Sequence, residues 1–135
     1  MNWLWKLFGS PPPPPAAGAD HLVYVRIPAP IDPEARGATY EDPLDAELRL
    51  AGLGCVSGGG TGLSDLDASG HREIEYCGVD IDTQNVGATR DLLRHHLPLL
   101  GCPAGTAIEY DHAGSYLRDI FDGNDWRLGQ VAPPE

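Results

Sequence analysis

The sequence predicts an α+β domain of the ferredoxin-like βαββαβ class, a sandwich of a four-stranded antiparallel sheet with two helices on one face, followed by a short C-terminal helix. Segments of alternating polarity and segments of helical periodicity follow one another in the order strand, helix, strand, strand, helix, strand. The two middle strands surround a turn rich in Asp, Ser and Gly, which is typical of a β-hairpin. Right-handed crossovers then place the first and third strands in the centre of the sheet.

The composition of residues 1–19 sets them apart from the domain, which we expect to span residues 20–122. An aromatic tip with Trp3, Trp5 and Phe8 is followed by five consecutive prolines, which favour a stiff, extended spacer. The apolar run is too short to cross a bilayer and lacks the features of a signal peptide. The tip could lie in a membrane interface or dock on a protein, and its single lysine predicts only weak membrane affinity.

The first strand and the first helix have clear boundaries in the sequence. Apolar and polar residues alternate over residues 21–27, and a proline-rich loop is expected to follow as far as Tyr40. Asp42 fits the N-cap of a helix, with Pro43 at its first position and Gly52 just beyond its end.

The central hairpin combines a glycine-rich strand with a strand that carries alternating carboxylates. In the second of these strands the apolar residues change from even to odd positions between Tyr76 and Val79. A strand cannot change phase without an extra residue, so we expect a β-bulge at Cys77 and Gly78.

The second helix is expected to begin after a cap at Thr83 or Asn85, and Pro98 should kink or shorten its last turn. Residues 107–111 are predicted to form the last strand.

The C-terminal part is predicted to contain no further strand. The apolar residues of segment 116–121 fit one face of a short helix. Residues 123–135 are expected to be an irregular tail.

The charge of the chain limits the classes of partner. Its net charge is −11, from 20 carboxylates and 9 basic residues, which argues against nucleic acid or an anionic membrane as the main partner. The three cysteines have no close spacing, so neither a disulfide framework nor a zinc site is expected. A reducing compartment, and hence a cytoplasmic location, follows.

Three segments carry a resemblance to known proteins: Tyr-Glu-Asp-Pro-Leu at 40–44, Gly-Cys-Val-Ser-Gly-Gly-Gly-Thr at 54–61, and Gly-Cys-Pro-Ala-Gly-Thr at 101–106. With them, the span from the first strand to Tyr110 resembles small bacterial proteins of the toxin-immunity type. The resemblance implies a protein that binds and neutralises a toxin, and it brings no catalytic motif.

The predicted sheet has one face that the two helices leave open, and its outward residues are mostly acidic. Six carboxylates against one arginine on neighbouring strands repel one another, which favours a surface that binds a basic protein partner. The alternative is that segment 116–121 folds back over this face, where Arg118 would neutralise part of the charge. The expected partner-binding residues are Tyr24, Arg26, Glu73, Glu75, Asp80, Asp82, Glu109 and Asp111.

Signals for catalysis or cofactor binding are weak. A phosphate cradle at the candidate loop residues Gly58, Gly59, Gly60 and Thr61 would need a following helix and a lysine, and the sequence offers neither. Paired carboxylates such as Asp80 and Asp82 could hold a hard cation, but no loop spacing completes the shell. We therefore predict a non-enzymatic protein without cofactor or metal; the alternative is a small enzyme or ligand-binding domain that uses the loop Gly58–Gly62 and the nearby carboxylates.

Overall fold

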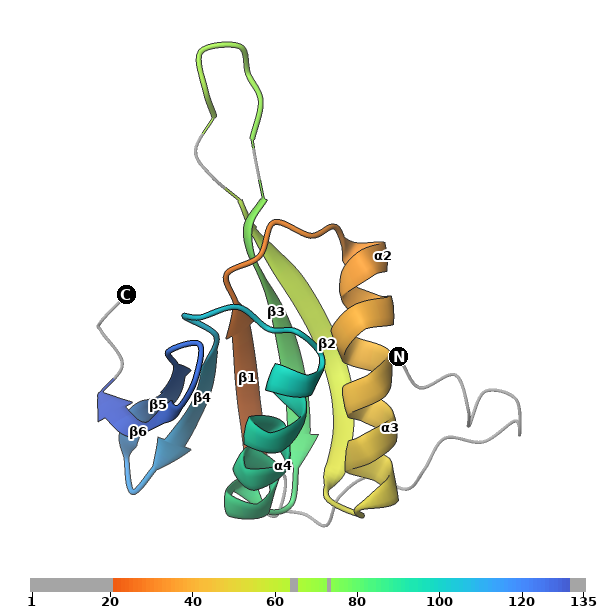
Figure 1. The fold of residues 1–135 in the computed structure, drawn as a ribbon, viewed down its shortest axis with the longest axis vertical. Helices are drawn as coiled ribbons and strands as arrows, with labels where there is room; N and C mark the ends of the chain where they lie inside the picture. The colour runs from red at the N-terminus through yellow and green to blue at the C-terminus, as the bar shows by residue number, and fades with distance from the viewer. Residues whose placement is uncertain (1–20, 64–65, 73, 132–135) are drawn as a thin grey trace, which may run out of the picture.

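A six-stranded antiparallel sheet forms the framework of the protein, with its strands in the order β2-β3-β1-β4-β5-β6 (Figure 1). The computed structural model describes residues 21–63, 66–72 and 74–131. The strands are β1 (His21–Ile27), β2 (Gly54–Leu63), β3 (Ile74–Thr83), β4 (Ala107–His112), β5 (Ser115–Phe121) and β6 (Trp126–Val131).

Two helical segments lie on the same face of this sheet (Figure 1). The first is continuous and consists of α2 (Pro33–Arg36), a π-helical turn η1 (Gly37–Glu41) and α3 (Asp42–Leu50). The second is α4 (Val86–Leu99), which contains Pro98. The core lies between these helices and the sheet, and its buried side chains include Val23, Val25 and Ile27 of β1, Leu44 and Leu48 of α3, and Leu93 and Leu97 of α4.

The predicted four-stranded ferredoxin-like sandwich with a C-terminal helix is wrong. The sheet has six strands, and the segment expected to be a C-terminal helix is strand β5. The segment expected to be an irregular tail contains strand β6.

Local signals placed several other elements correctly. β1 has the predicted bounds, and α4 begins after Asn85, whose side chain accepts a hydrogen bond from the Ala88 N–H at 3.0 Å. The helix that was expected to start at Asp42 begins earlier, because Asp32 caps α2 through the Ala35 N–H at 2.8 Å and Pro33 follows at the first position.

The bulge predicted at Cys77 and Gly78 does not occur there. Both residues pair regularly with β1 and with β2. The register instead shifts at Ser57 in β2 and at Glu75 in β3. Tyr76 therefore lies on the face away from the helices, together with Asp80 and Asp82, whereas the sequence suggested that it points inward.

β5 and β6 are anchored to the helix layer through one buried carboxylate. Asp119 is fully buried and accepts hydrogen bonds from Arg90 Nε at 2.8 Å and from Arg94 Nη1 at 2.9 Å. The Tyr110 hydroxyl at 3.0 Å and the Gly129 N–H at 2.9 Å also donate to it. The carboxylate thus joins α4, β4, β5 and β6, and its partners compensate for the loss of water around a buried charge.

Candidate partner-binding face

The sheet face opposite the helices, called the open face below, can be traced from the strand register. One row of paired residues crosses four strands of the sheet. Tyr24 of β1 lies between Asp80 of β3 and Glu109 of β4. Glu109 in turn lies opposite Arg118 of β5. Directly paired residues share a face, and the neighbours of Tyr24 along β1 are buried in the core. This row therefore faces away from the helices.

Four carboxylates form an acidic patch on the open face: Asp80, Asp82, Glu109 and Asp111. Asp80 and Asp82 belong to β3, and Glu109 and Asp111 belong to β4, so the two pairs stand on either side of the central strand β1. Strands are about 4.8 Å apart, so the pairs are separated by about 10 Å. No described helix or strand covers this patch.

The rings of Tyr24 and Tyr76 lie over two glycines of the hairpin strands on the open face. A Cβ at residue 78 would lie 1.9 Å from the hydroxyl oxygen of Tyr24, and a Cβ at residue 62 would lie 1.9 Å from the ring of Tyr76. The Arg26 guanidinium stacks on the Tyr76 ring at 3.6 Å from its centroid. These glycines therefore make room for the rings, and the Tyr76 ring holds Arg26 in place.

The side chain of Tyr24 stays protonated over a wide pH range. Desolvation by burial raises the pKa of Tyr24, and the negative charges nearby, including those of Asp80 and Glu109, raise it further, whereas Arg26 lowers it. At neutral pH the Tyr24 hydroxyl, which lies over Gly78, is therefore uncharged and able to donate a hydrogen bond.

Replacing Gly78 with alanine is expected to destabilise the protein by about 1–3 kcal/mol, because the new methyl group displaces the Tyr24 ring. In the background of Tyr24→Ala, the same replacement should cost less than about 0.5 kcal/mol, since the ring is already gone. Urea unfolding of the four proteins of this double-mutant cycle measures the coupling. Additive effects would show that the ring and the glycine are independent.

The structure brings together most of the predicted binding residues. Tyr24, Arg26 and the acidic patch share the open face, and Glu75 is exposed at the bulge of β3. Glu73 lies outside the described residues. Segment 116–121 does not fold back over this face, because it forms β5 beside β4 and extends the sheet.

Sequence reasoning missed the contribution of β5 to the open face. Arg118 stands opposite Glu109, and the Tyr116 hydroxyl donates a hydrogen bond to Glu109 Oε1 at 2.8 Å. The net negative charge of the open face is therefore smaller than the predicted balance of six carboxylates and one arginine. Polar and apolar residues do not alternate along this segment, because the outward side chains include Ile120 and the buried central side chain is Asp119, so the sequence carries no clear strand signal here.

The candidate loop at Gly58, Gly59, Gly60 and Thr61 is part of strand β2. On its inner side, a Cβ at residue 59 would lie 2.6 Å from Glu41 Oε2 and 3.0 Å from Arg36 Nε. The glycine at this position thus accommodates the ion pair of Arg36 and Glu41. A phosphate cradle needs inward N–H groups in a loop that leads into a helix, and this extended segment does not have that geometry.

The cysteines have the properties of space-filling residues. Desolvation by burial raises the pKa of the thiols of Cys55, Cys77 and Cys102, so they remain protonated at neutral pH. A protonated thiol is a poor nucleophile.

The described parts of the chain contain neither a cluster of metal ligands nor a helix able to span a membrane. Residues 21–63, 66–72 and 74–131 contain no group of three His, Cys, Asp or Glu side chains placed to hold a metal ion. Within the same ranges, the helices are too short or too polar to cross a membrane. The aromatic tip with Trp3, Trp5 and Phe8 lies outside these ranges, so its expected contacts stay a prediction.

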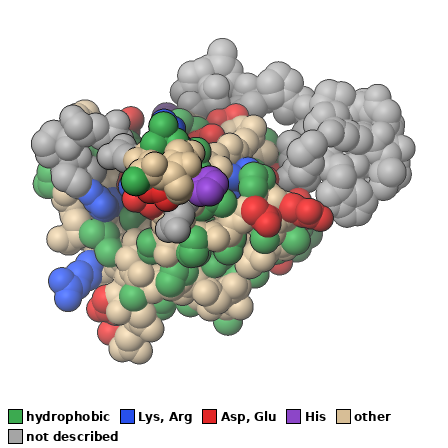
Figure 2. All heavy atoms as spheres, turned by 90° about the horizontal axis from the view of Figure 1, so that it is seen from above, with side chains coloured by type: hydrophobic (Ala, Val, Ile, Leu, Met, Phe, Trp, Pro, Cys, Tyr) green, Lys and Arg blue, Asp and Glu red, His purple; other side chains and the backbone are tan. Residues whose placement is uncertain are grey.

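The two ends of the open face differ in charge. The acidic patch lies toward the start of β1, whereas Arg26 and, on β6, Arg127 lie toward the end from which the β2–β3 hairpin projects. Figure 2 looks onto this hairpin end, and basic side chains project there on the side of β5 and β6. Comparison with known proteins adds no assignment, since no family model, curated protein or solved structure matches the chain significantly.

Proposed function

We propose that this chain is a non-enzymatic binding protein of the immunity or adaptor type, which uses its open face to bind and neutralise a basic protein partner, such as a toxin, in the bacterial cytoplasm. The observation that carries the proposal is the acidic patch of Asp80, Asp82, Glu109 and Asp111 on a face that the described helices leave free. Like charges so close together cost stability, and a basic partner compensates for that cost.

The make-up of the open face suits protein recognition. Tyr24 and Tyr76 present rigid rings between the charged side chains, and tyrosine and arginine are enriched at the centres of protein interfaces. Tyr24 is already packed on Gly78 and Tyr76 on Gly62, so little side-chain entropy is lost on binding.

No described feature favours the alternative of a small enzyme or ligand-binding domain. That alternative depended on a loop at Gly58–Gly62, and these residues belong to a strand. The carboxylates near it belong to the open face of the sheet.

A charge-reversal experiment tests the proposal. The purified chain is immobilised, its partner is captured from an extract of the native cell and identified by mass spectrometry, and binding of the purified partner is then titrated at increasing salt. The double variant Asp80→Lys, Glu109→Lys should weaken binding at least about tenfold, because both substitutions flank Tyr24 in the central row. Association should also become markedly slower as salt screens the charges.

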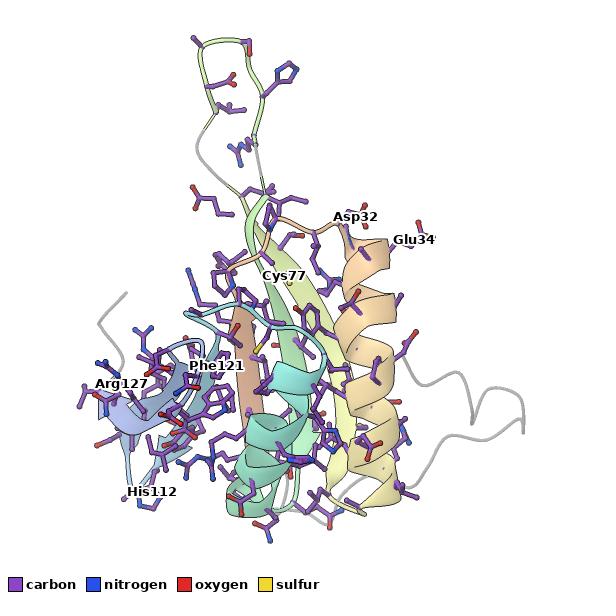
Figure 3. All side chains as sticks on the ribbon, viewed as in Figure 1. Asp32, Glu34, Cys77, His112, Phe121 and Arg127 are labelled. Carbon is purple, nitrogen blue, oxygen red and sulfur yellow. The ribbon has the colours of Figure 1, made fainter. Side chains whose placement is uncertain are left out.

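The matched control is the double variant Glu34→Lys, Asp125→Lys, which makes the same change in net charge at two exposed positions away from the acidic patch. Figure 3 labels Glu34 on α2, at the opposite margin of the molecule from β6. This control should bind within about twofold of the unmodified chain. Equal losses in both double variants, or binding that is insensitive to salt, would contradict a site on the open face.

A further inference from the structure

The two edges of the sheet differ in how they are protected. Along the β2 edge, the buried side chain of Asp45 on α3 accepts a hydrogen bond from the Val56 N–H at 2.9 Å. This contact satisfies an edge donor and holds a helix beside the strand. At the other edge, Figure 1 shows β6 as the outermost strand, with no described helix or strand beyond it.

The side chains of β6 resemble those of an interface more than those of a protected edge. Leu128 is 51% exposed and Val131 is 81% exposed. Within Trp126–Val131 the only charged residue is Arg127, and none is acidic, although the chain carries 20 carboxylates. Protected edges usually carry inward or flanking charges that prevent another strand from pairing.

β6 also contains two features that protect an edge: a bulge at Gly129, where the backbone φ is +64°, and a hydrogen bond of 2.9 Å from the Gln130 side-chain amide to the Leu128 carbonyl. The N–H of Gly129 donates to Asp119 and is turned into the protein. The bulge therefore serves the buried carboxylate, and the hydrogen bond from Gln130 is an exposed side-chain contact that a neighbouring strand can replace.

We propose that β6 is a self-association edge, at which it pairs antiparallel with β6 of a second copy of this chain. A two-fold axis between Leu128 and Gly129 sets a self-complementary register. In that register Trp126 lies opposite the partner's Val131, Arg127 opposite the partner's Gln130, and Leu128 opposite the partner's Gly129. No carboxylate meets another across the new strand pair.

Repulsion between two chains of net charge −11 does not prevent this arrangement. The carboxylates of the acidic patch lie on β3 and β4, and five strand spacings, or about 24 Å, separate β4 from its equivalent in the second copy. This distance is about three Debye lengths at physiological ionic strength. The acidic patches of the two copies are thus screened from one another, and the paired residues of β6 bring no carboxylates together.

The arrangement has a structural consequence for the open face. An antiparallel pair of equivalent edges has its two-fold axis perpendicular to the sheet, so both helix layers lie on one side and both open faces on the other. The dimer would present two acidic patches on one continuous surface. This inference does not depend on the identity of a partner, and it holds or fails independently of the proposed function.

Sedimentation velocity of the full chain tests self-association between about 1 and 500 µM, a range that suits a small interface. We expect a reversible monomer–dimer equilibrium. The double variant Leu128→Glu, Val131→Glu should weaken the dimer at least tenfold, because two carboxylates then meet next to the two-fold axis and one more enters each end of the strand pair. The control Leu50→Glu, Leu99→Glu adds the same charge at residues that are 84% and 71% exposed on α3 and α4, and it should leave the dimer unchanged.

Hydrogen exchange of the unmodified chain gives a second measurement that requires no variant. The amides of residues 126–131 should become more protected as protein concentration rises, while those of β2 should not change. A chain that stays monomeric over the whole range would overturn the proposal. A dimer that both double variants weaken equally, or that neither weakens, would overturn it as well.

Discussion

Replacing Asp119 with alanine is expected to lower the free energy of unfolding by about 3–5 kcal/mol, because breaking a buried ion pair leaves its partners uncompensated. Five hydrogen bonds converge on this fully buried carboxylate. Without it, two arginines, the Tyr110 hydroxyl and the Gly129 N–H lose their acceptor. Urea unfolding followed by circular dichroism measures the loss.

The Asp119 carboxylate should also make the free energy of unfolding depend on pH. Burial alone raises the pKa of Asp119, but hydrogen bonds from Arg90, the Gly129 N–H and Tyr110 lower it below the usual 3.8. The unfolded chain therefore binds the proton more readily than the folded protein does. The stabilisation is fully present above pH 3.8 and is lost as the pH falls through the lower pKa of the folded state. The alanine variant should lack this part of the acid sensitivity.

Asp91→Ala is the matched control for Asp119→Ala. Asp91 is an exposed carboxylate that pairs with the same Arg94. Its removal should cost less than about 1 kcal/mol, as is typical of surface ion pairs. A similar small cost for both variants would show that the buried carboxylate does not hold β5 and β6 to α4.

Replacing Gly54 with alanine is expected to destabilise the protein by about 3 kcal/mol, at the upper end of the cost of overpacking. A Cβ at this position would lie 2.0 Å from the backbone oxygen of Asp82 and 2.9 Å from the Cα of Thr83. Both are backbone atoms of the paired strand β3, so no side-chain rotation relieves the contact. The backbone φ of +156° adds strain for a residue with a side chain.

Gly60→Ala in the same strand is the control for Gly54→Ala. A Cβ at residue 60 meets nothing within 4 Å, and its φ is not positive. This substitution should be neutral or should stabilise the protein by up to about 1 kcal/mol, because alanine restricts the unfolded chain. Urea unfolding of both variants gives the comparison, and equal destabilisation would contradict a clash specific to Gly54.

The C-terminal segment shows why one element was assigned the wrong structure. Tyr116, Leu117, Ile120 and Phe121 have helical spacing, and the strand alternation is hidden because its central inward position is occupied by Asp119. A carboxylate in a sequence indicates a solvent-exposed position unless its partners are known. Those partners, Arg90 and Arg94, come from a helix more than twenty residues earlier.

In the β2–β3 hairpin, an exposed aromatic residue led to a wrong prediction of the position of the β-bulge. The sequence shows a phase change between Tyr76 and Val79, and its alternation predicts that Tyr76 points into the core. In the structure its ring lies on Gly62 under Arg26, on the open face. The bulge therefore falls at Glu75, and this depends on contacts between three strands that no single strand reveals.

The sequence by itself determined the elements whose signals are local. The alternation of β1, the Asn85 cap of α4 and the glycine-rich hairpin depend on neighbouring residues, and so do the carboxylates of β3 and β4 that form the acidic patch. Only the tertiary structure decided the number of strands, the site of the bulge, the neutralising Arg118 and the open edge of β6. These features arise where distant segments meet, and a buried charge or a ring over a glycine is stable only when its partner is in place.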